Sequence, residues 1–352
     1  MEEFDVVIVG AGFAGLACAQ AAAKGGLKVV VLERKKDVGD QLHTTGILVK
    51  EAADAFEVPE ELVHEVTRVR LYSPDLSHID LNSPDYFFHA TNTPGVMRHL
   101  CKMAEEAGAE IRTGTSYFGA SKIGNHFDLS RYPIRTKALV GADGPRSRVA
   151  LDFGLGTNSA FLLGAELEFD RLDLDPSSFH CFLDNQLAHG YLAWVIPGVN
   201  MSQVGLATRL PKTPDLNLFM EKTSHLFDYG SAKLIGRRGG LIPVGGTVAP
   251  HQNEGVFLLG DASGVVSPLT GGGIHTALHC GKELGEKLAD WLGDENPTSK
   301  SIPKMRYRGF RVKHVMRWCF EHLATNRVMN LVIKSFWFKW LAREVFFRPK
   351  RL

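Results

Sequence analysis

The sequence predicts an α/β fold that opens with a Rossmann-like unit, and three observations carry this prediction. Two continuous apolar runs, DVVIVG (5–10) and LKVVVLER (27–34), are typical of buried strands and flank an alanine-rich helix. The segment GAGFAG places its glycines at the turn between the first strand and that helix. Glu33 ends the second strand, 18 residues after Gly15. A βαβ unit with this glycine turn and this acid predicts dinucleotide binding.

Bulk composition indicates an ordinary globular protein. The chain has 352 residues, 44% hydrophobic and 22% charged, which is long enough for two domains or for one domain with a large insertion. Its five cysteines are scattered without a C-x-x-C pair, which favours a reducing compartment over a disulfide framework. No basic stretch precedes the first strand and no apolar run reaches transmembrane length. We therefore expect no signal peptide and a cytoplasmic location.

The following segments alternate between strand and helix patterns. Residues 51–92 contain two strand-like runs, VTRVRLYS and SHIDLNS, separated by a Pro-Asp turn. Thr93-Pro94 then begins a helix, with proline at its first position. KALVGADGPRSRV (137–149) is another buried strand that runs into an acid between glycines, and residues 160–210 alternate as strands do.

A third glycine–acid element follows the apolar run GVFLLG. Asp261 directly follows this strand, and Gly271, Gly272 and Gly273 precede a helical pattern from Ile274. Glycines let a backbone approach a ligand closely, and a helix start offers free N–H groups. Because ligands gather at the carboxyl ends of strands in an open α/β sheet, one extended dinucleotide can touch all three elements.

These residues resemble a known family. In order and spacing, GAGFAG with Glu33, GADGPRS and GDASGVVSPLTGGGI resemble the FAD-binding signatures of the p-hydroxybenzoate hydroxylase-like flavoproteins, and most closely their geranylgeranyl reductase-related branch. The resemblance covers about residues 1–290 and implies FAD as the cofactor. It implies a Rossmann-like FAD-binding domain with an inserted α+β substrate domain built on a β-sheet, followed by C-terminal helices. The implied ranges are 1–50, 93–155 and 247–295 for FAD binding, 51–92 and 156–246 for substrate, and 300–352 for basic aromatic helices.

The resemblance also implies roles for individual residues. The first glycines would cradle the pyrophosphate, Glu33 would bond the adenosine ribose, Asp261 would bond the ribityl chain or a pyrophosphate water, and the helix from Ile274 would aim its N–H groups at the flavin. The full implied cofactor set is Gly10, Gly12, Ala14, Gly15, Glu33, Arg34, Asp143, Gly144, Gly260, Asp261, Pro268, Gly271, Gly272, Gly273 and Ile274. Relatives usually carry an arginine where this chain has Thr93.

The substrate side is expected in the inserted sheet. The branch's Tyr-x-Trp-x-Phe-Pro motif appears here as Tyr191, Trp194 and Pro197, with one extra residue between Tyr and Trp. A bulge would return the first two to one face. A cysteine in many relatives faces the flavin from a loop that here reads QLHTTGIL, and His43 is the candidate occupant. The flavin N5 would be the hydride donor.

Three functions fit the cofactor motifs. The leading interpretation is reduction of carbon–carbon double bonds in a prenyl lipid or quinone-like substrate. No second G-x-G-x-x-G is present, so NAD(P)H, if it is the electron donor, binds only transiently. The alternatives are a flavin monooxygenase (or halogenase) acting on an aromatic or polyene, and a flavoprotein passing electrons to a membrane quinone. His275 and His279 have metal-ligand spacing, but no third ligand accompanies them, so we expect no metal.

Charge is distributed unevenly along the chain. From Lys300 onward, 14 Lys and Arg face two Glu, a net +12, whereas residues 1–299 sum to −11. Val312, Val315, Met316, Cys319, Phe320 and Leu323 fall on one helical face. One interpretation of this segment is a helix pair that packs on the body of the protein and exposes its basic face to solvent. The other is an anchor that lies on an anionic membrane surface. We expect no nucleic-acid partner. The oligomeric state is not predicted.

Overall fold

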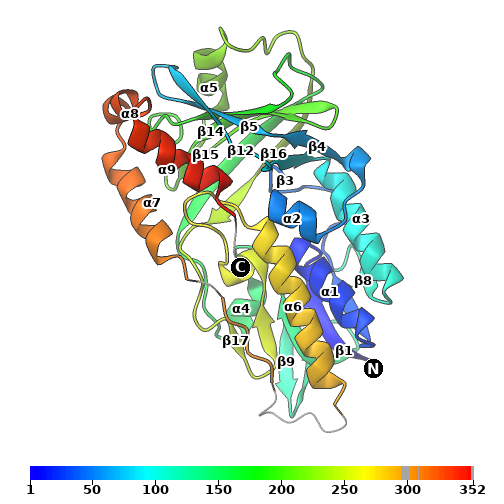
Figure 1. The fold of residues 1–352 in the computed structure, drawn as a ribbon. Coiled ribbons are helices and arrows are strands. Elements are labelled where there is room, and N and C mark those ends of the chain that lie inside the picture. The colour runs from blue at the N-terminus through cyan, green and yellow to red at the C-terminus, as the bar shows by residue number, and fades with distance from the viewer. Residues whose placement is uncertain (295–301, 308, 350–352) are drawn as a thin grey trace.

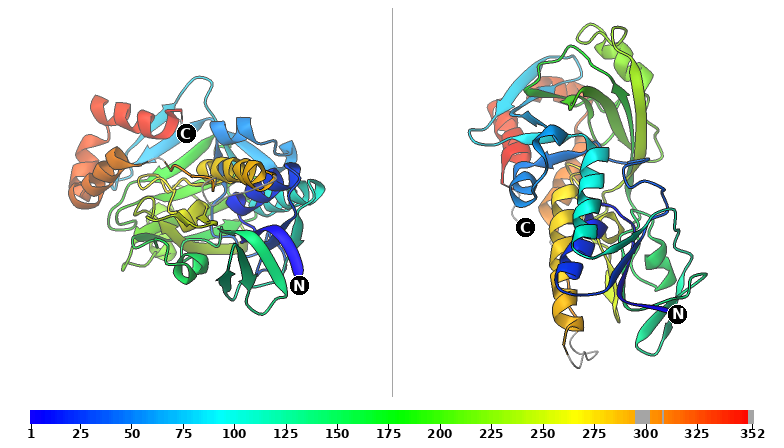
Figure 2. Two further views of the ribbon diagram at one scale, coloured as in Figure 1. Left: turned by 90° about the horizontal axis from the view of Figure 1, so that it is seen from below. Right: turned by 90° about the vertical axis from the view of Figure 1, so that its right-hand side faces the viewer.

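The computed structural model describes residues 1–294, 302–307 and 309–349. The parts of the predicted ranges at 295, 300, 301, 308 and 350–352 lie outside these described residues. The molecule is elongated, with one sheet near the N-terminus and a second at the opposite end, as Figures 1 and 2 show. Within the described residues, none of the helices combines the length and the apolar character needed to cross a bilayer.

The first sheet is parallel at its centre. Strand β1 (Glu2–Val9) pairs in parallel with β2 (Val29–Leu32) and β11 (Ile134–Gly141), and β11 pairs in parallel with β18 (Val256–Leu258). Its remaining strands are β8 (Glu110–Arg112), β9 (Ala120–Ile123), β10 (His126–Leu129) and β17 (Gln252–Asn253). All these strands come from the segments assigned to FAD binding, and the division into domains stays a prediction.

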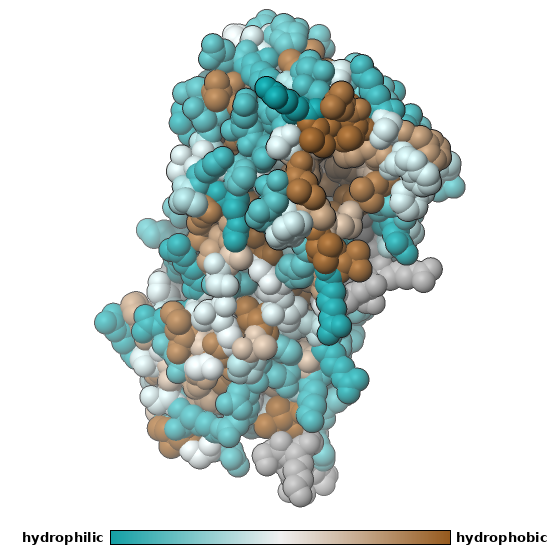
Figure 3. All heavy atoms as spheres, turned by 90° about the vertical axis from the view of Figure 1, so that its left-hand side faces the viewer, coloured by the Kyte–Doolittle hydropathy of each residue, from teal (hydrophilic) through white to brown (hydrophobic). Residues whose placement is uncertain are grey.

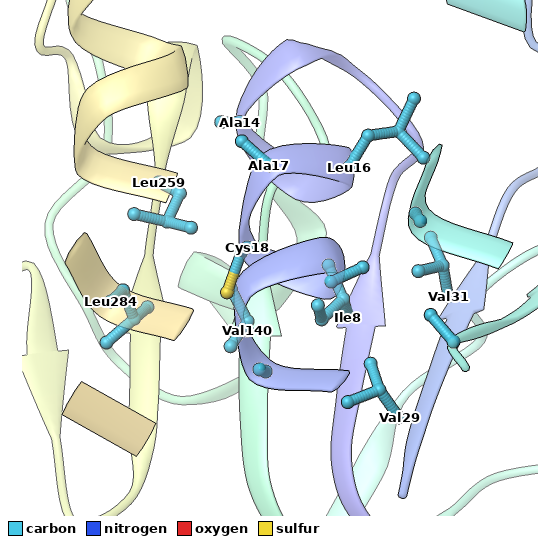
Figure 4. Close-up of a cluster of buried hydrophobic side chains, with 14 of the residues drawn as sticks. Ile8, Ala14, Leu16, Ala17, Cys18, Val29, Val31, Val140, Leu259 and Leu284 are labelled. Carbon is cyan, nitrogen blue, oxygen red and sulfur yellow. The ribbon is translucent and has the colours of Figure 1, made fainter. Parts of the chain in front are cut away.

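Three helices cover one face of this sheet: α1 (Phe13–Lys24), α3 (Thr93–Glu106) and α6 (Ile274–Leu292). The predicted alanine-rich helix is α1, and small residues let α6 approach it closely. A Cβ built at Gly285 of α6 would lie 2.6 Å from the carbonyl oxygen of Cys18. Figure 4 shows Cys18 and Leu284 between the two helices, with Ile8 and Val140 of the sheet beneath. The short helix α4 (Arg148–Asp152) follows β11.

The second sheet has seven strands and is mostly antiparallel. Its order is β16 (Leu234–Pro243), β12 (Phe161–Phe169), β15 (Met201–Arg209), β14 (Ala193–Gly198), β13 (Ser178–Phe182), β5 (Arg68–Tyr72) and β6 (His78–Asn82). A three-stranded sheet of β3 (Ile47–Val49), β7 (Phe88–Thr91) and β4 (Val63–Val66) lies beside it. Short helical elements are α2 (Lys50–Ala55), α5 (Leu216–Thr223), η1 (Glu60–Leu62) and η2 (Gly260–Ser263).

The chain returns at its C-terminal end as three helices: α7 (Arg311–Leu323), α8 (Asn326–Val332) and α9 (Phe336–Phe347). Met329, Ile333, Ala342 and Phe347 are buried in one apolar cluster with residues of the second sheet and of β7. Asp184 in turn accepts a hydrogen bond from Asn326 Nδ2 (2.8 Å) at the start of α8. The C-terminal helices are therefore packed on the body of the molecule.

Candidate flavin and substrate site

The turn between β1 and α1 forms an open cradle at a helix start. Gly10 adopts φ +102°, and a Cβ there would lie 2.3 Å from the carbonyl oxygen of Ala142. A Cβ at Gly15 would lie 2.0 Å from the Gly10 carbonyl oxygen, so side chains are excluded at both positions. Gly12, the N-cap of α1, has no atom within 4 Å of its Cβ position and no side-chain cap. The first N–H groups of α1 thus face open space, which suits a pyrophosphate.

Glu33 lies directly after β2 and beside this cradle. Its side chain is buried, and its carboxylate accepts hydrogen bonds from the backbone N–H groups of Ala11 and Lys35, both at 2.9 Å. A carboxylate has about four acceptor positions, so it can accept further bonds from ribose hydroxyls. The neighbouring Arg34 is exposed, and Ala14 lines the cavity described below.

The second element follows β11. Asp143 Oδ2 accepts hydrogen bonds from the N–H groups of Arg148 (2.7 Å) and Val149 (3.2 Å), so it holds the start of α4. Its other oxygen, Oδ1, is buried and has no hydrogen-bond partner among the described residues. Burial raises the pKa of Asp143. Gly144, at φ +86°, has nothing within 4 Å of its Cβ position and lines the cavity.

The third element follows β18 and holds a carboxylate without a donor. Gly260 adopts φ +56°, and Asp261 lies beside it in η2. Burial raises the pKa of Asp261 to about 6. Within the described part of the chain, no group donates a hydrogen bond to this carboxylate, which lines the cavity. A ribityl hydroxyl is the kind of donor that this carboxylate can accept.

The glycine-rich loop after this element leads directly into α6. Gly271 N donates to the carbonyl oxygen of Ser267 (2.9 Å), and Ser267 N donates to that of Gly272 (3.0 Å), which fixes the loop. Gly273 is the N-cap of the 19-residue α6 without a side-chain cap. Gly271, Gly272, Gly273 and Ile274 line the cavity, whereas Pro268 is buried behind it. A flavin along this loop would meet the positive end of the helix dipole.

One cavity of about 920 Å³ joins these elements to the second sheet. Its residues include Gly12, Ala14, Gly144, Gly260, Asp261 and the glycines before α6. The cavity wall is supported from behind by residues that do not line it themselves: Gly10, Gly15, Glu33 and Asp143. The Asp261 carboxylate, which accepts no hydrogen bond from the described residues, and the open cradle at Gly12 are the features that an FAD molecule would satisfy. The residues present therefore fit FAD.

His43 lies on the loop that enters the cavity from the other side. Its Nδ1 lies 2.6 Å from the carbonyl oxygen of Gly239, so Nδ1 carries the proton and Nε2 is the acceptor in the neutral ring. Arg238 Nη1 donates to the carbonyl oxygen of Thr44 (3.1 Å), and Gln203 Nε2 donates to that of Thr45 (3.0 Å). This loop is thus held against the second sheet.

An arginine does lie beside Thr93, but it comes from a distant segment. Arg238 Nη1 also donates to the Thr93 hydroxyl at 3.1 Å. Arg98, which follows Thr93 on α3, instead pairs with Asp37 at 2.9 Å. At the position where relatives carry an arginine, this chain therefore has Thr93, and Arg238 of β16 brings its guanidinium to that position.

Tyr191 and Trp194 both line the cavity, and no bulge is needed for this. Tyr191 precedes β14, which begins at Ala193, so strand alternation does not apply to the pair. The Tyr191 hydroxyl donates to the carbonyl oxygen of Thr270 in the glycine-rich loop. Trp194 lies over Gly205, where a Cβ would be 2.5 Å from the indole ring. Pro197, by contrast, is buried in β14 away from the cavity.

The C-terminal helices form a further wall that sequence reasoning missed. Val315, Met316, Cys319, Phe320 and Leu323 of α7 line the cavity, while Val312 is exposed. From α9, Phe338, Leu341, Ala342, Val345 and Phe346 line it as well. The apolar helical face predicted at 312–323 thus borders a cavity. The spacing of its apolar residues predicted the face but not the surface that it would contact.

Arg317 connects this wall to the glycine-rich loop. Its buried guanidinium donates from Nη1 to the carbonyl oxygen of Pro268 (2.6 Å) and from Nη2 to that of Gly190 (3.2 Å). Glu321, one turn further along α7, pairs with it at 2.7 Å. Because Gly190 precedes Tyr191, a single side chain ties α7 to both the flavin loop and the substrate wall.

Comparison with known proteins agrees with this geometry. The family model described as FAD binding domain matches residues 3–215. A digeranylgeranylglycerophospholipid reductase of Methanopyrus kandleri is 30% identical over 333 residues, covering 87% of this chain and 85% of the relative. Another of the same name, from Methanocaldococcus jannaschii, is 27% identical over 93% of this chain and 87% of its own.

A solved structure shares the whole fold. A geranylgeranyl bacteriochlorophyll reductase-like protein of Thermoplasma acidophilum matches with a TM-score of 0.84 and 21% identity, covering 99% of this chain and 97% of its own. The reductase relatives do not favour the monooxygenase, halogenase and electron-transfer alternatives. The predicted α/β fold, the FAD cofactor and the family resemblance are confirmed. The chain belongs to the FAD-binding-domain family and, within it, to the geranylgeranyl reductase-like FAD-dependent oxidoreductases.

Proposed function

We propose that this protein reduces carbon–carbon double bonds in the prenyl chains of a lipid. The observation that carries the proposal is the cavity itself, whose glycine-rich end suits a flavin and whose other walls are apolar side chains of the second sheet, α7 and α9. A prenyl chain is apolar throughout, so burial against these side chains stabilises it by about 0.8 kcal/mol per CH₂ group. The names of the relatives, digeranylgeranylglycerophospholipid reductase, support a substrate of this chemical class.

Different residues of the chain would have different roles in this reaction. Bound reduced FAD supplies the hydride. The loop 267–273, fixed by Tyr191 and Arg317, would hold the flavin, and the free N–H groups at the start of α6 would stabilise negative charge on it. Trp194 and Phe320, which line the cavity, would hold the prenyl chain there and exclude water. We propose NAD(P)H as a transient electron donor.

We further propose that the substrate enters from an anionic membrane surface. Hydrophobic side chains gather around a hollow on the face that carries α7 and α8 (Figure 3). Leu331 (81% exposed), Trp337 (76%) and Trp340 (53%) project from α8 and α9. The exposed cations Lys334, Lys339 and Arg343 lie among them. Aromatic side chains at the headgroup boundary with cations beside them suit a surface that lies on anionic lipid.

An anaerobic half-reaction tests the proposed reductase function. The FAD-loaded protein is reduced chemically and mixed with vesicles that contain digeranylgeranylglycerophospholipid or its fully saturated counterpart. We expect flavin absorbance to return with the unsaturated lipid only, and the product to gain two hydrogens per double bond. A flavin that stays reduced in the presence of the unsaturated lipid, with no saturated product, would contradict the proposal.

A further inference from the structure

A buried carboxyl group stands in the cavity wall apart from the flavin-binding elements. Glu166, at the middle of β12, is only 4% exposed, yet it lines the cavity. The other acidic residue in the described lining is Asp261, which belongs to the strand end expected to hold the ribityl chain. Glu166 lies on the second sheet, the side that carries Trp194 and the apolar substrate wall.

The neighbours of Glu166 join it to both the substrate wall and the His43 loop. Trp194 Nε1 donates to Oε2 at 2.9 Å, and Gln203 Nε2 donates to Oε1 at 3.2 Å. The same Gln203 amide donates to the carbonyl oxygen of Thr45, and the Thr45 hydroxyl also contacts the carboxyl. The acid therefore lies between the indole of the predicted substrate site and the loop that faces the flavin.

Among the described residues, no cation forms an ion pair with Glu166. Arg238, whose charge acts on Glu166, pairs through Nη2 with Glu168 of β12 and donates from Nη1 to Thr44 and Thr93. The two side chains of that ion pair are 7% and 13% exposed, and Glu168 balances much of the charge of Arg238. Burial raises the pKa of Glu166, although Trp194, Thr45 and Arg238 act against this rise. A raised pKa favours the neutral form of the carboxyl, which has a proton to give.

We propose that Glu166 is the acid that protonates the double bond during reduction. Saturating an unactivated alkene requires a hydride at one carbon and a proton at the other. As the hydride from the reduced flavin forms one C–H bond, the π bond breaks, and the Glu166 O–H proton forms the second C–H bond. The resulting carboxylate takes a proton from water once the product has left. The step rests on the proposed reductase function and uses only the hydride that this function supplies.

The primary test is Glu166→Gln, which keeps an acceptor for Trp194 and removes the titrating proton. Glu61→Gln, on the exposed turn η1, is the matched control. We expect E166Q to bind FAD and to be reduced chemically as the wild type is. Reoxidation of its flavin by digeranylgeranylglycerophospholipid vesicles should fall at least a hundredfold, in the range of general-acid effects, while E61Q stays at the wild-type rate. Reoxidation of E166Q within threefold of wild type would overturn the assignment.

A second readout needs neither cofactor nor turnover. Infrared difference spectra of the apoprotein, wild type minus E166Q, should contain the C=O band of a protonated carboxyl at neutral pH, and wild type minus E61Q should not. A Glu166 ionised at neutral pH overturns the inference whether or not the wild type is active. A wild type that fails to reduce the lipid while showing this band would instead count against the reductase function alone.

Trp194→Phe keeps the proposal testable if E166Q does not fold. Removing the indole donor withdraws a hydrogen bond that stabilises the ionised carboxylate, so the pKa of Glu166 should rise. Activity requires the protonated acid and is lost as the pH rises through this pKa. The alkaline limb of the W194F rate profile should therefore move to higher pH. An unmoved limb, or one that moves to lower pH, would mean that Glu166 serves only to hold Trp194.

Discussion

Asp261→Asn should make the apoprotein more stable and the FAD complex weaker. In the apoprotein the Asp261 carboxylate has no donor among the described residues, and burial raises its pKa from 3.8 to about 6. A difference of about two units corresponds to about 3 kcal/mol of unfolding free energy, an upper figure because the side chain is partly open to the cavity. Asparagine has nearly the same shape and carries no charge to desolvate. The variant therefore removes this cost.

The pH dependence of this effect follows from the direction of the shift. Because the pKa is raised in the folded state, the folded protein binds more protons than the unfolded chain between about pH 4 and 6. The wild-type apoprotein should lose stability as the pH rises through this window. Above about pH 6 the full difference between variant and wild type should be present, and below about pH 4 it should vanish.

Two measurements decide this prediction. Urea unfolding of the apoproteins at pH 5 and pH 8 gives the stability difference, and titration with FAD at pH 8 gives the affinity. Losing the charged acceptor of a buried ribityl hydroxyl should cost about 1–3 kcal/mol, or roughly tenfold to over a hundredfold in Kd. Ser263→Ala, at a neighbour that bonds the Gly260 carbonyl oxygen, is a control for general disturbance of η2. An Asn variant that is no more stable at pH 8, or that binds FAD as tightly as wild type, would refute the reasoning.

Three further predictions concern packing, substrate and membrane. Gly285→Ala should destabilise the protein by about 1–2 kcal/mol despite alanine's better helix propensity, because its Cβ would lie 2.6 Å from a carbonyl oxygen of α1; a raised Tm would contradict this. Trp194→Ala should keep FAD, by absorbance, and lose most lipid turnover, whereas normal turnover would remove it from the site. Reversing Lys334, Lys339 and Arg343 to Glu should remove at least about 3 kcal/mol of attraction to anionic vesicles, over a hundredfold in sedimentation affinity at low salt, with FAD content unchanged. Absent binding by the parent protein, or binding untouched by the reversal, would mean that these helices serve only the cavity.

The elements at the cofactor-binding end of this protein could be predicted from the sequence because their motifs are local. A glycine turn between an apolar strand and a helix, with Glu33 ending the next strand, constrains the backbone over about 30 residues, and the structure places these elements as predicted. The same holds for Asp261 after β18 and for the glycines before α6. In such motifs the spacing along the chain determines the spacing of the residues in the structure. A single sequence is therefore enough to predict this part of the site.

The substrate end was decided by tertiary structure. Nothing near Glu166 in the sequence distinguishes it from Glu168 two residues later. Yet Glu166 lines the cavity and forms no ion pair with the described residues, whereas Glu168 pairs with Arg238. The sequence predicted the apolar face of α7, but this face borders a cavity that β14 and α9 also line. Strand β14 lies more than a hundred residues before α7 in the sequence. Periodicity records which side of an element is apolar. Which surface it meets depends on how strands and helices distant in sequence pack together, and only the folded chain contains that information.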